Sequence, residues 1–205
     1  MKISLVQKIL DILRLKTFKD YLNCNPVALR GLLNFLSLFE YRNRNSIMQT
    51  RLLRFIGCNV GKNVHLGCNI HIYLPRNLTI EDNVWISDNN KFLCWNKIHL
   101  KQMSFTSVNV SFLAGSHNVN DYSDVIDNQD IYIKNGVWIG ANATILGGAK
   151  IGKGCIIGAG SICLGKEYSE FCIYAGNPAK KIKERQPSDV IYQPVTYKLE
   201  EIINE

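Results

Sequence analysis

The sequence predicts an all-β protein, a parallel β-helix of six-residue repeats with helices before it and a helix and tail after it. Two observations carry this prediction. From Ile133 the chain reads IKNGVW, IGANAT, ILGGAK, IGKGCI, IGAGSI, so an isoleucine recurs every six residues. The fifth place of each hexad is small or β-branched: Val137, Ala143, Ala149, Cys155 and Ser161. An α-helix would instead repeat its apolar residues at i+3, i+4 and i+7.

Each hexad is expected to supply one short strand and one corner. The aliphatic residue would point into a narrow interior, and the small residue would lie where the corners crowd together. Gly140, Gly152 and Gly158 hold the second place, where we expect backbone angles that a Cβ atom would disfavour. Three hexads would close a triangular coil. Coils would then stack through strand hydrogen bonds, because one coil cannot bury its aliphatic face alone.

The same frame begins earlier, near residue 57. It runs through Val60, Leu66, Leu74, Ile80 and Ile86, slips by two residues, and continues at Cys94, Leu100, Thr106 and Phe112. The number of hexads predicts about five coils and a prism roughly 24 Å tall. The predicted β-helix spans residues 57–165, and a polar, acidic loop at 117–132 is expected to leave it.

Residues 1–56 lack the repeat and are expected to form a helical region. Apolar residues between Ile3 and Leu13 recur at helical spacing, with lysines mostly on other faces. This helix could lie on a membrane surface, or pack on the prism or a neighbouring subunit, and we favour packing. Residues 27–41 and 46–56 are expected to be further short helices. In the C-terminal region, 166–205, residues 175–185 predict a turn and a basic helix, followed by a tail.

Composition narrows the partners and the compartment. The formal charge is +7, which favours an anionic partner such as a cofactor or a lipid surface. No nucleic-acid recognition motif occurs, so nucleic acid is not expected. The seven cysteines include no CxxC pair and are expected to be reduced packing residues of a cytoplasmic protein. Asp11 and Arg14 interrupt the apolar start, which argues against a signal peptide.

Four histidines occupy the sixth place of a hexad and are expected to point outward at corners: His65, His71, His99 and His117. The first three continue directly into repeat sequence and are expected to be surface or interface residues. His117 is the last residue before the polar loop, near Asp121 and Asp124. Its side chain has the pKa range of a general base near neutral pH, although a lone histidine more often has a structural role.

Three segments in order give a resemblance to a known family. The segments GSHN (115–118), VWIGANATILGGAKIGKGCIIGAGSI (137–162) and AGNPAKKIKER (175–185) together resemble the maltose, galactoside and xenobiotic branch of the hexapeptide-repeat acyltransferases. NLTIEDNVWI (77–86) and AGSHNVNDYSD (114–124) are similar to colanic-acid-type exopolysaccharide O-acetyltransferases. The resemblance implies a left-handed β-helix, a homotrimer with active sites between subunits, and acetyl-CoA as co-substrate without a required metal. It also implies a sugar or polysaccharide precursor as acceptor.

The resemblance also implies roles for particular residues. His117 would be the general base of a direct transfer, with no acyl-enzyme. The residues that match the family's cofactor groove and phosphate contacts are Trp138, Gly140, Ala141, Ala159, Gly160, Lys166, Pro178, Lys180 and Lys183. The turn at Gly165 to Glu167 departs from the family pattern by an inserted residue, which affects Lys166 most. Asn89, Trp95 and Asp121 are acceptor-side candidates by position.

Other functions remain open at this stage. A zinc hydratase of the γ-carbonic-anhydrase type shares the β-helix, and His65, His71 and His99 could supply its ligands. The GNPAK segment and the His117 loop favour the acetyltransferase. A non-catalytic scaffold would not need His117. Within the acetyltransferases, a drug or an amino acid could replace the sugar as acceptor.

Overall fold

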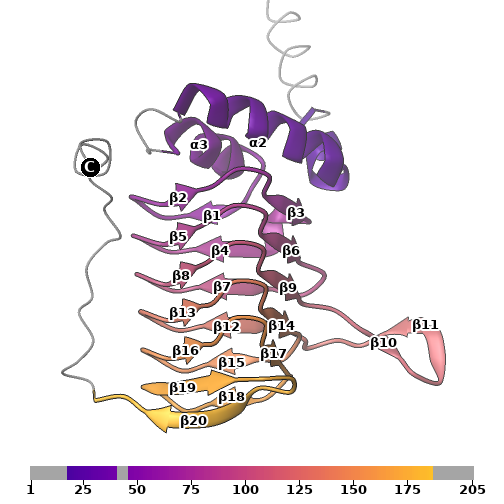
Figure 1. The fold of residues 1–205 in the computed structure, drawn as a ribbon. Coiled ribbons are helices and arrows are strands. Elements are labelled where there is room, and N and C mark those ends of the chain that lie inside the picture. Colours follow the sequence, from indigo (N-terminus) through magenta and orange to yellow (C-terminus); the bar gives the residue numbers. More distant parts are fainter. Residues whose placement is uncertain (1–17, 41–45, 187–205) are drawn as a thin grey trace, which may run out of the picture.

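The computed structural model describes residues 18–40 and 46–186, and the chain forms a prism of stacked coils within these ranges. Figure 1 shows helices at one end of the stack, the strand β20 at the other end, and a hairpin that leaves the side. All pairings between coils are parallel, as in a parallel β-helix. The fold class that the hexads predict is confirmed.

Three sheets form the sides of the prism, here named A, B and C. Sheet A contains β1 (Asn59–Val60), β4 (Leu78–Ile80), β7 (Ile98–Leu100), β12 (Ile131–Ile133), β15 (Lys150–Ile151) and β18 (Glu167–Tyr168). Sheet B contains β2 (His65–Leu66), β5 (Trp85–Ile86), β8 (Phe105–Thr106), β13 (Trp138–Ile139), β16 (Ile156–Ile157), β19 (Cys172–Ala175) and β20 (Lys180–Glu184). Sheet C contains β3 (His71–Tyr73), β6 (Lys91–Leu93), β9 (Ser111–Leu113), β14 (Thr144–Leu146) and β17 (Ile162–Cys163).

The chain passes from A to B to C in each complete coil, so a complete coil has an A–B, a B–C and a C–A corner. Five coils are complete, and a sixth has only its first two strands, β18 and β19. The prediction of about five coils was therefore one partial coil short. Two hexad positions were also predicted wrongly. Leu74 and Cys94 were expected to fill the interior, but Ile72 and Phe92 fill it, and Leu74 and Cys94 begin insertions at C–A corners. The first three coils thus repeat every 20 residues, with Val60, Ile80 and Leu100 in register.

The interior is a column of apolar side chains, one from each strand. Phe92 and Phe112 stack with ring centroids 4.8 Å apart, and Ile133, Ile139 and Ile145 are fully buried. The small residues at the fifth place, Val137 to Ser161, are also fully buried, as the hexads predict. Because strands enclose this narrow column on every side, one aliphatic residue per hexad is enough to fill it.

Glycine is required at the second place for a reason other than the backbone angles that we expected. A Cβ atom added to Gly140 would lie 2.6 Å from the backbone nitrogen of Ala159 in the next coil. These glycines therefore allow close approach between coils. The left-handed backbone conformation occurs instead at the fourth place, for example at Asn142 (φ 60°) and Gly154 (φ 65°). Asparagine and glycine tolerate that region better than other residues, which explains their use there.

Helices cover the first coil. Residues 18–24 are helical, followed by α2 (Pro26–Glu40) and α3 (Ile47–Phe55), which confirms the two predicted helices at 27–41 and 46–56. Leu29 and Leu33 of α2 and Leu53 of α3 are buried against the prism. Within the described ranges, no helix is long and apolar enough to cross a bilayer. The helix predicted between Ile3 and Leu13 lies outside the described residues, as does nearly all of the tail.

The basic helix predicted within 175–185 is wrong, because Lys180 to Glu184 form the strand β20. This strand pairs antiparallel with β19, the outermost coil strand of sheet B (Figure 1). The open edge of β19 offers unpaired backbone groups, and pairing with them outweighs the modest helical preference of a lysine-rich segment. Four of its five residues are charged, and lysines are common on protected sheet edges.

Candidate active site

His117 stands where the chain leaves the prism at the C–A corner of the third coil. It begins β10 (His117–Asn118), which pairs antiparallel with β11 (Asp121–Val125) to form the projecting hairpin in Figure 1. The amide of Ile126 donates to the carbonyl of Ser116 at 3.0 Å, which closes the base of the hairpin. The chain re-enters the prism at β12. His117 is exposed at this base.

The predicted acceptor residue Trp95 lies beside His117. Leu93, Trp95, Gly115, Ser116 and His117 line a cavity of about 160 Å³. The cavity is mostly apolar apart from the imidazole and the hydroxyl. It offers room for a small part of a ligand next to a group that can accept a proton.

The insertion after β6 builds one wall of this cavity. Residues 94–97 lengthen the C–A corner of the second coil, and the side-chain amide of Asn77 donates to the carbonyl of Cys94 at 2.9 Å. The backbone and side-chain amides of Asn96 both donate to the carbonyl of Ala114, at 2.7 and 3.2 Å. Trp95 is thus held at the base of the hairpin.

The glycine before Ser116 lets the hairpin approach this tryptophan. A Cβ atom on Gly115 would lie 2.9 Å from the Cβ of Trp95, so a larger residue would push the two segments apart. Tyr73 of the first coil packs against the indole, with ring centroids 5.3 Å apart. Sequence reasoning missed Tyr73 and Gly115, although the 20-residue period places Tyr73 one coil before Leu93.

Asp121 and Asn89, the other two acceptor candidates, have local structural contacts. Asp121 Oδ1 accepts hydrogen bonds from the amide and hydroxyl of Ser123, at 3.0 and 2.6 Å, and so shapes the hairpin turn. Asn89 lies at the B–C corner of the second coil with φ 60°, and its Oδ1 accepts from Asn69 at 2.7 Å. Neither residue lines the His117 cavity. The side chain of Asp124 is outside the described part.

Most of the predicted cofactor residues gather along the B–C corner and sheet B. Gly140 and Ala141 of the fourth coil stack on Ala159 and Gly160 of the fifth, and the amide of Gly160 donates to the carbonyl of Ala141 at 2.8 Å. Pro178 follows at the same corner in the sixth coil, next to β20 with Lys180 and Lys183. This arrangement is a narrow strip of small residues that ends in lysines.

Trp138 projects from sheet B beside this strip. The residue is 47% exposed, and its Nε1 donates to the Oγ of Ser107 at 3.1 Å. The half-exposed ring offers an apolar surface with a fixed orientation. Trp85 is its counterpart two coils earlier, where it stacks on His65 with ring centroids 3.7 Å apart.

Lys166 does not join the other cofactor candidates. It lies at a C–A corner, and its ammonium group is 5.3 Å from the ring centroid of Tyr168. Within one chain, sheet C therefore separates two groups of predicted residues. His117, Trp95 and Lys166 lie at C–A corners, and the B–C corner holds the glycine and alanine strip.

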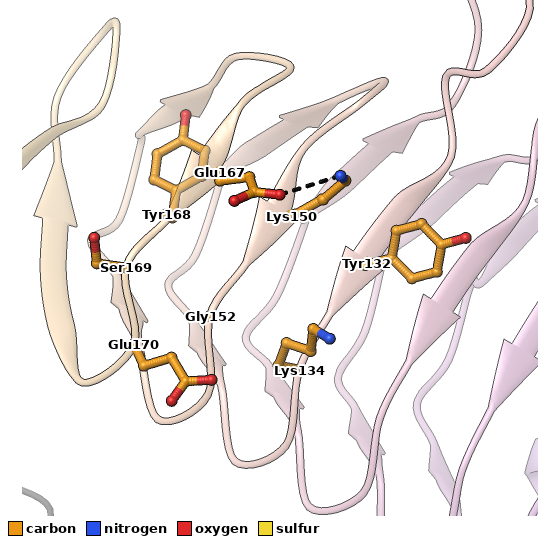
Figure 2. Close-up of a pocket in the computed structure, with 8 residues that line it drawn as sticks. All are labelled: Tyr132, Lys134, Lys150, Gly152, Glu167, Tyr168, Ser169 and Glu170. Atoms are coloured by element: carbon orange, nitrogen blue, oxygen red, sulfur yellow. Dashed lines mark hydrogen bonds and ion pairs between the residues drawn. The ribbon is translucent and has the colours of Figure 1, made fainter.

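A larger hollow lies on sheet A, at the coils near the C-terminal end. Its volume is about 620 Å³, and the residues that line it are Tyr132, Lys134, Lys150, Gly152, Glu167, Tyr168, Ser169 and Glu170 (Figure 2). Lys150 and Glu167 form an ion pair at 3.1 Å across it, drawn as a dashed line. It contains none of the residues that the sequence predicts for the site, and its charges are balanced.

The histidines proposed as zinc ligands have separate environments. His65 is on sheet B, His71 on sheet C and His99 on sheet A. His71 Nε2 lies 2.9 Å from Arg30, and burial and this guanidinium lower its pKa. His99 stacks on Tyr132 at 4.7 Å, and burial lowers its pKa as well. Among the described residues, no three His, Cys, Asp or Glu side chains are grouped so that they could hold a metal.

Comparison with known proteins defines the class. Residues 130–165 match the family described as bacterial transferase hexapeptide (six repeats). WcaF of Escherichia coli K12, by its name a colanic acid biosynthesis acetyltransferase, is 30% identical over 134 residues, which cover 65% of this chain and 73% of WcaF. The chain belongs to the hexapeptide-repeat acetyltransferase family, and it is an acyltransferase.

Two solved structures show the same fold. The maltose O-acetyltransferase of Clostridium difficile 630 aligns with a TM-score of 0.70 at 26% identity, covering 84% of this chain and 88% of that one. AntD, an N-acyltransferase from Bacillus cereus solved with dTDP and coenzyme A, aligns with a TM-score of 0.56 at 26% identity, covering 76% and 95%. The family resemblance in the sequence is thus confirmed.

Proposed function

We propose that this protein transfers the acetyl group of acetyl-CoA to a hydroxyl group of a sugar or polysaccharide precursor. The observation that carries the proposal is the position of His117, exposed at the base of the hairpin in a cavity that also contains Trp95. Sugar rings pack well on aromatic side chains, because their C–H faces are apolar. The maltose enzyme and WcaF carry sugar-related names, which supports a sugar acceptor.

The chemistry follows from an imidazole beside a bound hydroxyl. A ring nitrogen of His117 takes the proton as the acceptor oxygen attacks the thioester carbonyl. The tetrahedral intermediate carries an oxyanion, which backbone N–H groups can stabilise. It then collapses, the C–S bond breaks, and the imidazolium returns the proton to the CoA sulfur. No protein nucleophile is needed, so Ser116 has no covalent role.

The cofactor assignment rests on the strip along the B–C corner. AntD binds coenzyme A, and a strip of small residues leaves room for the thin pantetheine arm of such a ligand. Lys180 and Lys183 would provide charge for its phosphates. Because sheet C separates this strip from His117, one chain does not complete the site. A homotrimer that brings the strip of one subunit to the His117 corner of the next would complete it.

Replacing His117 tests the proposal directly. His117→Ala should lower kcat by roughly 10²–10⁴-fold and leave the affinity for acetyl-CoA nearly unchanged, because only proton transfer is lost. Ser116→Ala, next to it in the same cavity, is the control and should retain most of the activity. Release of CoA thiol with maltose or a galactoside as acceptor measures the rate, and calorimetry measures cofactor affinity.

Three results would contradict the proposal. Near-normal turnover of His117→Ala on the best acceptor would exclude its role as base. Strong activity with amines or chloramphenicol and none with any sugar hydroxyl would instead place the acceptor among amino compounds or drugs. Activity that a chelator abolishes and zinc restores would revive the metal hydratase.

A further inference from the structure

The positive charge of this chain is concentrated in its first 56 residues. Residues 1–56 contain ten Lys and Arg against three Asp and Glu, a net charge of +7. Residues 57–186 contain 13 Lys and Arg against ten Asp and Glu, a net charge of +3, and residues 187–205 contain one lysine against four acidic residues, a net charge of −3. The prism is thus only weakly basic. Most of the positive charge belongs to the segment with the helices that cover the first coil.

The same helices expose large apolar side chains. In α2, Val27 is 66% exposed and Phe35 is 56% exposed. They lie on the helix face opposite Leu29 and Leu33, which are buried against the prism, and Gly31 lies between them. A helix of a globular protein normally presents polar residues on its outer face. The outer face of α2 is instead apolar.

The neighbouring helical segments extend this apolar surface. Phe18 and Tyr21 are 45% and 53% exposed, and Ile47 and Phe55 of α3 are 50% and 41% exposed. Exposed Arg51 lies between Ile47 and Phe55 at a spacing of four residues, so it shares their helix face. Across the described residues, 7 of the 14 exposed large hydrophobic side chains lie between residues 18 and 55. We give the name cap surface to Lys19, Arg51 and these seven residues: Phe18, Tyr21, Val27, Phe35, Ile47, Met48 and Phe55.

We propose that the cap surface binds an anionic lipid bilayer. Basic residues are drawn to acidic headgroups, and exposed Val, Ile, Phe and Tyr can enter the boundary between headgroups and acyl chains. Nucleic acid would use the positive charge but has no use for the apolar side chains. A second copy docked cap to cap would bring Lys19 and Arg51 of two cap surfaces together, which like-charge repulsion disfavours. An anionic bilayer can bind both the basic and the apolar side chains of the cap surface.

The position of the cap surface suits this partner. The helices lie at one end of the prism, and the hairpin and the strand β20 lie elsewhere along it (Figure 1). Binding through that end leaves the sides of the prism accessible. If the protein is the trimer of the proposed function, threefold symmetry places three caps at one height along its axis. Three weak contacts would then act together on one membrane.

Vesicle flotation with the full-length protein tests this inference. Wild-type protein should float with vesicles of equal parts phosphatidylcholine and phosphatidylglycerol, should not float with phosphatidylcholine alone, and should dissociate at high salt. Lys19→Glu with Arg51→Glu should lower binding at least tenfold, since each basic residue contributes roughly fivefold near an anionic surface. Val27→Ser with Ile47→Ser should also lower it. Circular dichroism confirms that each variant is folded.

Matched controls separate the cap surface from general effects. Lys62→Glu with Lys97→Glu changes the net charge equally on the prism, and Val108→Ser removes a similarly exposed apolar residue there. Both should float like wild type. Absence of wild-type flotation, equal loss for both charge pairs, or no loss for Val27→Ser with Ile47→Ser would each overturn the proposal. Acetyl transfer to a free sugar needs no vesicle, so failure here does not affect the proposed function.

Discussion

A single methyl group decides whether two coils can stack at the second place of a hexad. Gly140→Ala would place a Cβ atom 2.6 Å from the amide nitrogen of Ala159, and backbone cannot rotate away as a side chain can. We expect a loss of about 1–3 kcal/mol in the free energy of unfolding. Urea unfolding, followed by circular dichroism, measures it.

The matched control is a glycine with free space around it. Gly31 in α2 has no atom within 4 Å of its missing Cβ. Gly31→Ala should therefore stabilise the protein by about 0.5–1 kcal/mol, since alanine favours the helix. If both substitutions shift stability in the same direction, contact between coils is not the reason for the glycine at the second place.

The buried thiols predict a loss of stability at high pH. Burial raises the pKa of Cys58 to about 12 and that of Cys163 to about 11, against 9.0 for a free thiol. Above pH 9 the unfolded chain loses these protons while the folded chain keeps them, so stability is full below pH 9 and falls as the pH rises through 11–12. Each thiol contributes at most about 1.4 kcal/mol per pH unit.

Comparison with a Cys58→Ala variant isolates this effect from other alkaline groups. The variant should be less stable at pH 7 because it loses buried volume, but its stability should fall less steeply above pH 9. Denaturant midpoints across pH 7–11 measure both slopes. Parallel curves for the two proteins would contradict the raised pKa of Cys58.

At the scale of the element, β20 presents the lysines assigned to the cofactor phosphates. Lys180→Ala with Lys183→Ala should weaken CoA binding roughly 10–100-fold, since charge-assisted contacts are lost. Lys181→Ala is the control, because Lys181 already pairs with Glu184 at 2.6 Å and should matter little. Calorimetry with CoA and dephospho-CoA separates the phosphates. Equal effects of the control and the double variant would place the phosphates elsewhere.

The same strand shows where sequence reasoning failed at this scale. The composition of residues 175–185 favours a basic helix, and nothing local indicates the open edge of β19 that captures them. Tertiary pairing decided the structure, as it often does for short segments. Prediction from the hexads was more reliable, because the interior residue of each hexad has the same environment in successive coils. Even so, the insertions after Tyr73 and Leu93 led to two wrong assignments of the interior residue. Leu74 and Cys94 are apolar, so the sequence alone did not distinguish them from Ile72 and Phe92.

The candidate site was only partly readable for a related reason. His117 was marked by the loop that follows it and by its family motif. Its neighbour Trp95 comes from an earlier coil, and Tyr73 from the coil before that. Their contact depends on the 20-residue register of the first coils, which two insertions conceal in the sequence. The separation of His117 from Gly140 by sheet C also needs the order of sheets, which residue spacing alone does not provide.

At the scale of the whole molecule, the divided site predicts a trimer. Sedimentation or light scattering should give three times the 23.3 kDa chain mass at micromolar concentration. A mixing experiment tests shared sites more sharply. His117→Ala and a groove-filling Ala141→Trp variant should each be inactive alone. After joint refolding, about a quarter of the sites should combine an intact histidine with an intact groove.

The outcomes of this mixing experiment are clear. Recovered activity in the mixture means that two subunits form each site. A monomeric mass, or a trimer without recovery when both variants are folded, would contradict the shared site. Unmixed variants kept at the same total concentration serve as the control for slow exchange or residual activity.

The 20-residue period of the first coils makes the prism a molecular ruler. Val60, Ile80 and Leu100 occupy equivalent places, so removing or adding one whole coil there keeps every pairing in register. Such a change would move the His117 corner by one strand spacing, about 4.8 Å, relative to the helices at the end. If those helices rest on a membrane, the coil number sets the height at which acetylation occurs above the lipid. That height can then change only in steps of one whole coil, because adding or removing part of a coil would turn the core residues outward.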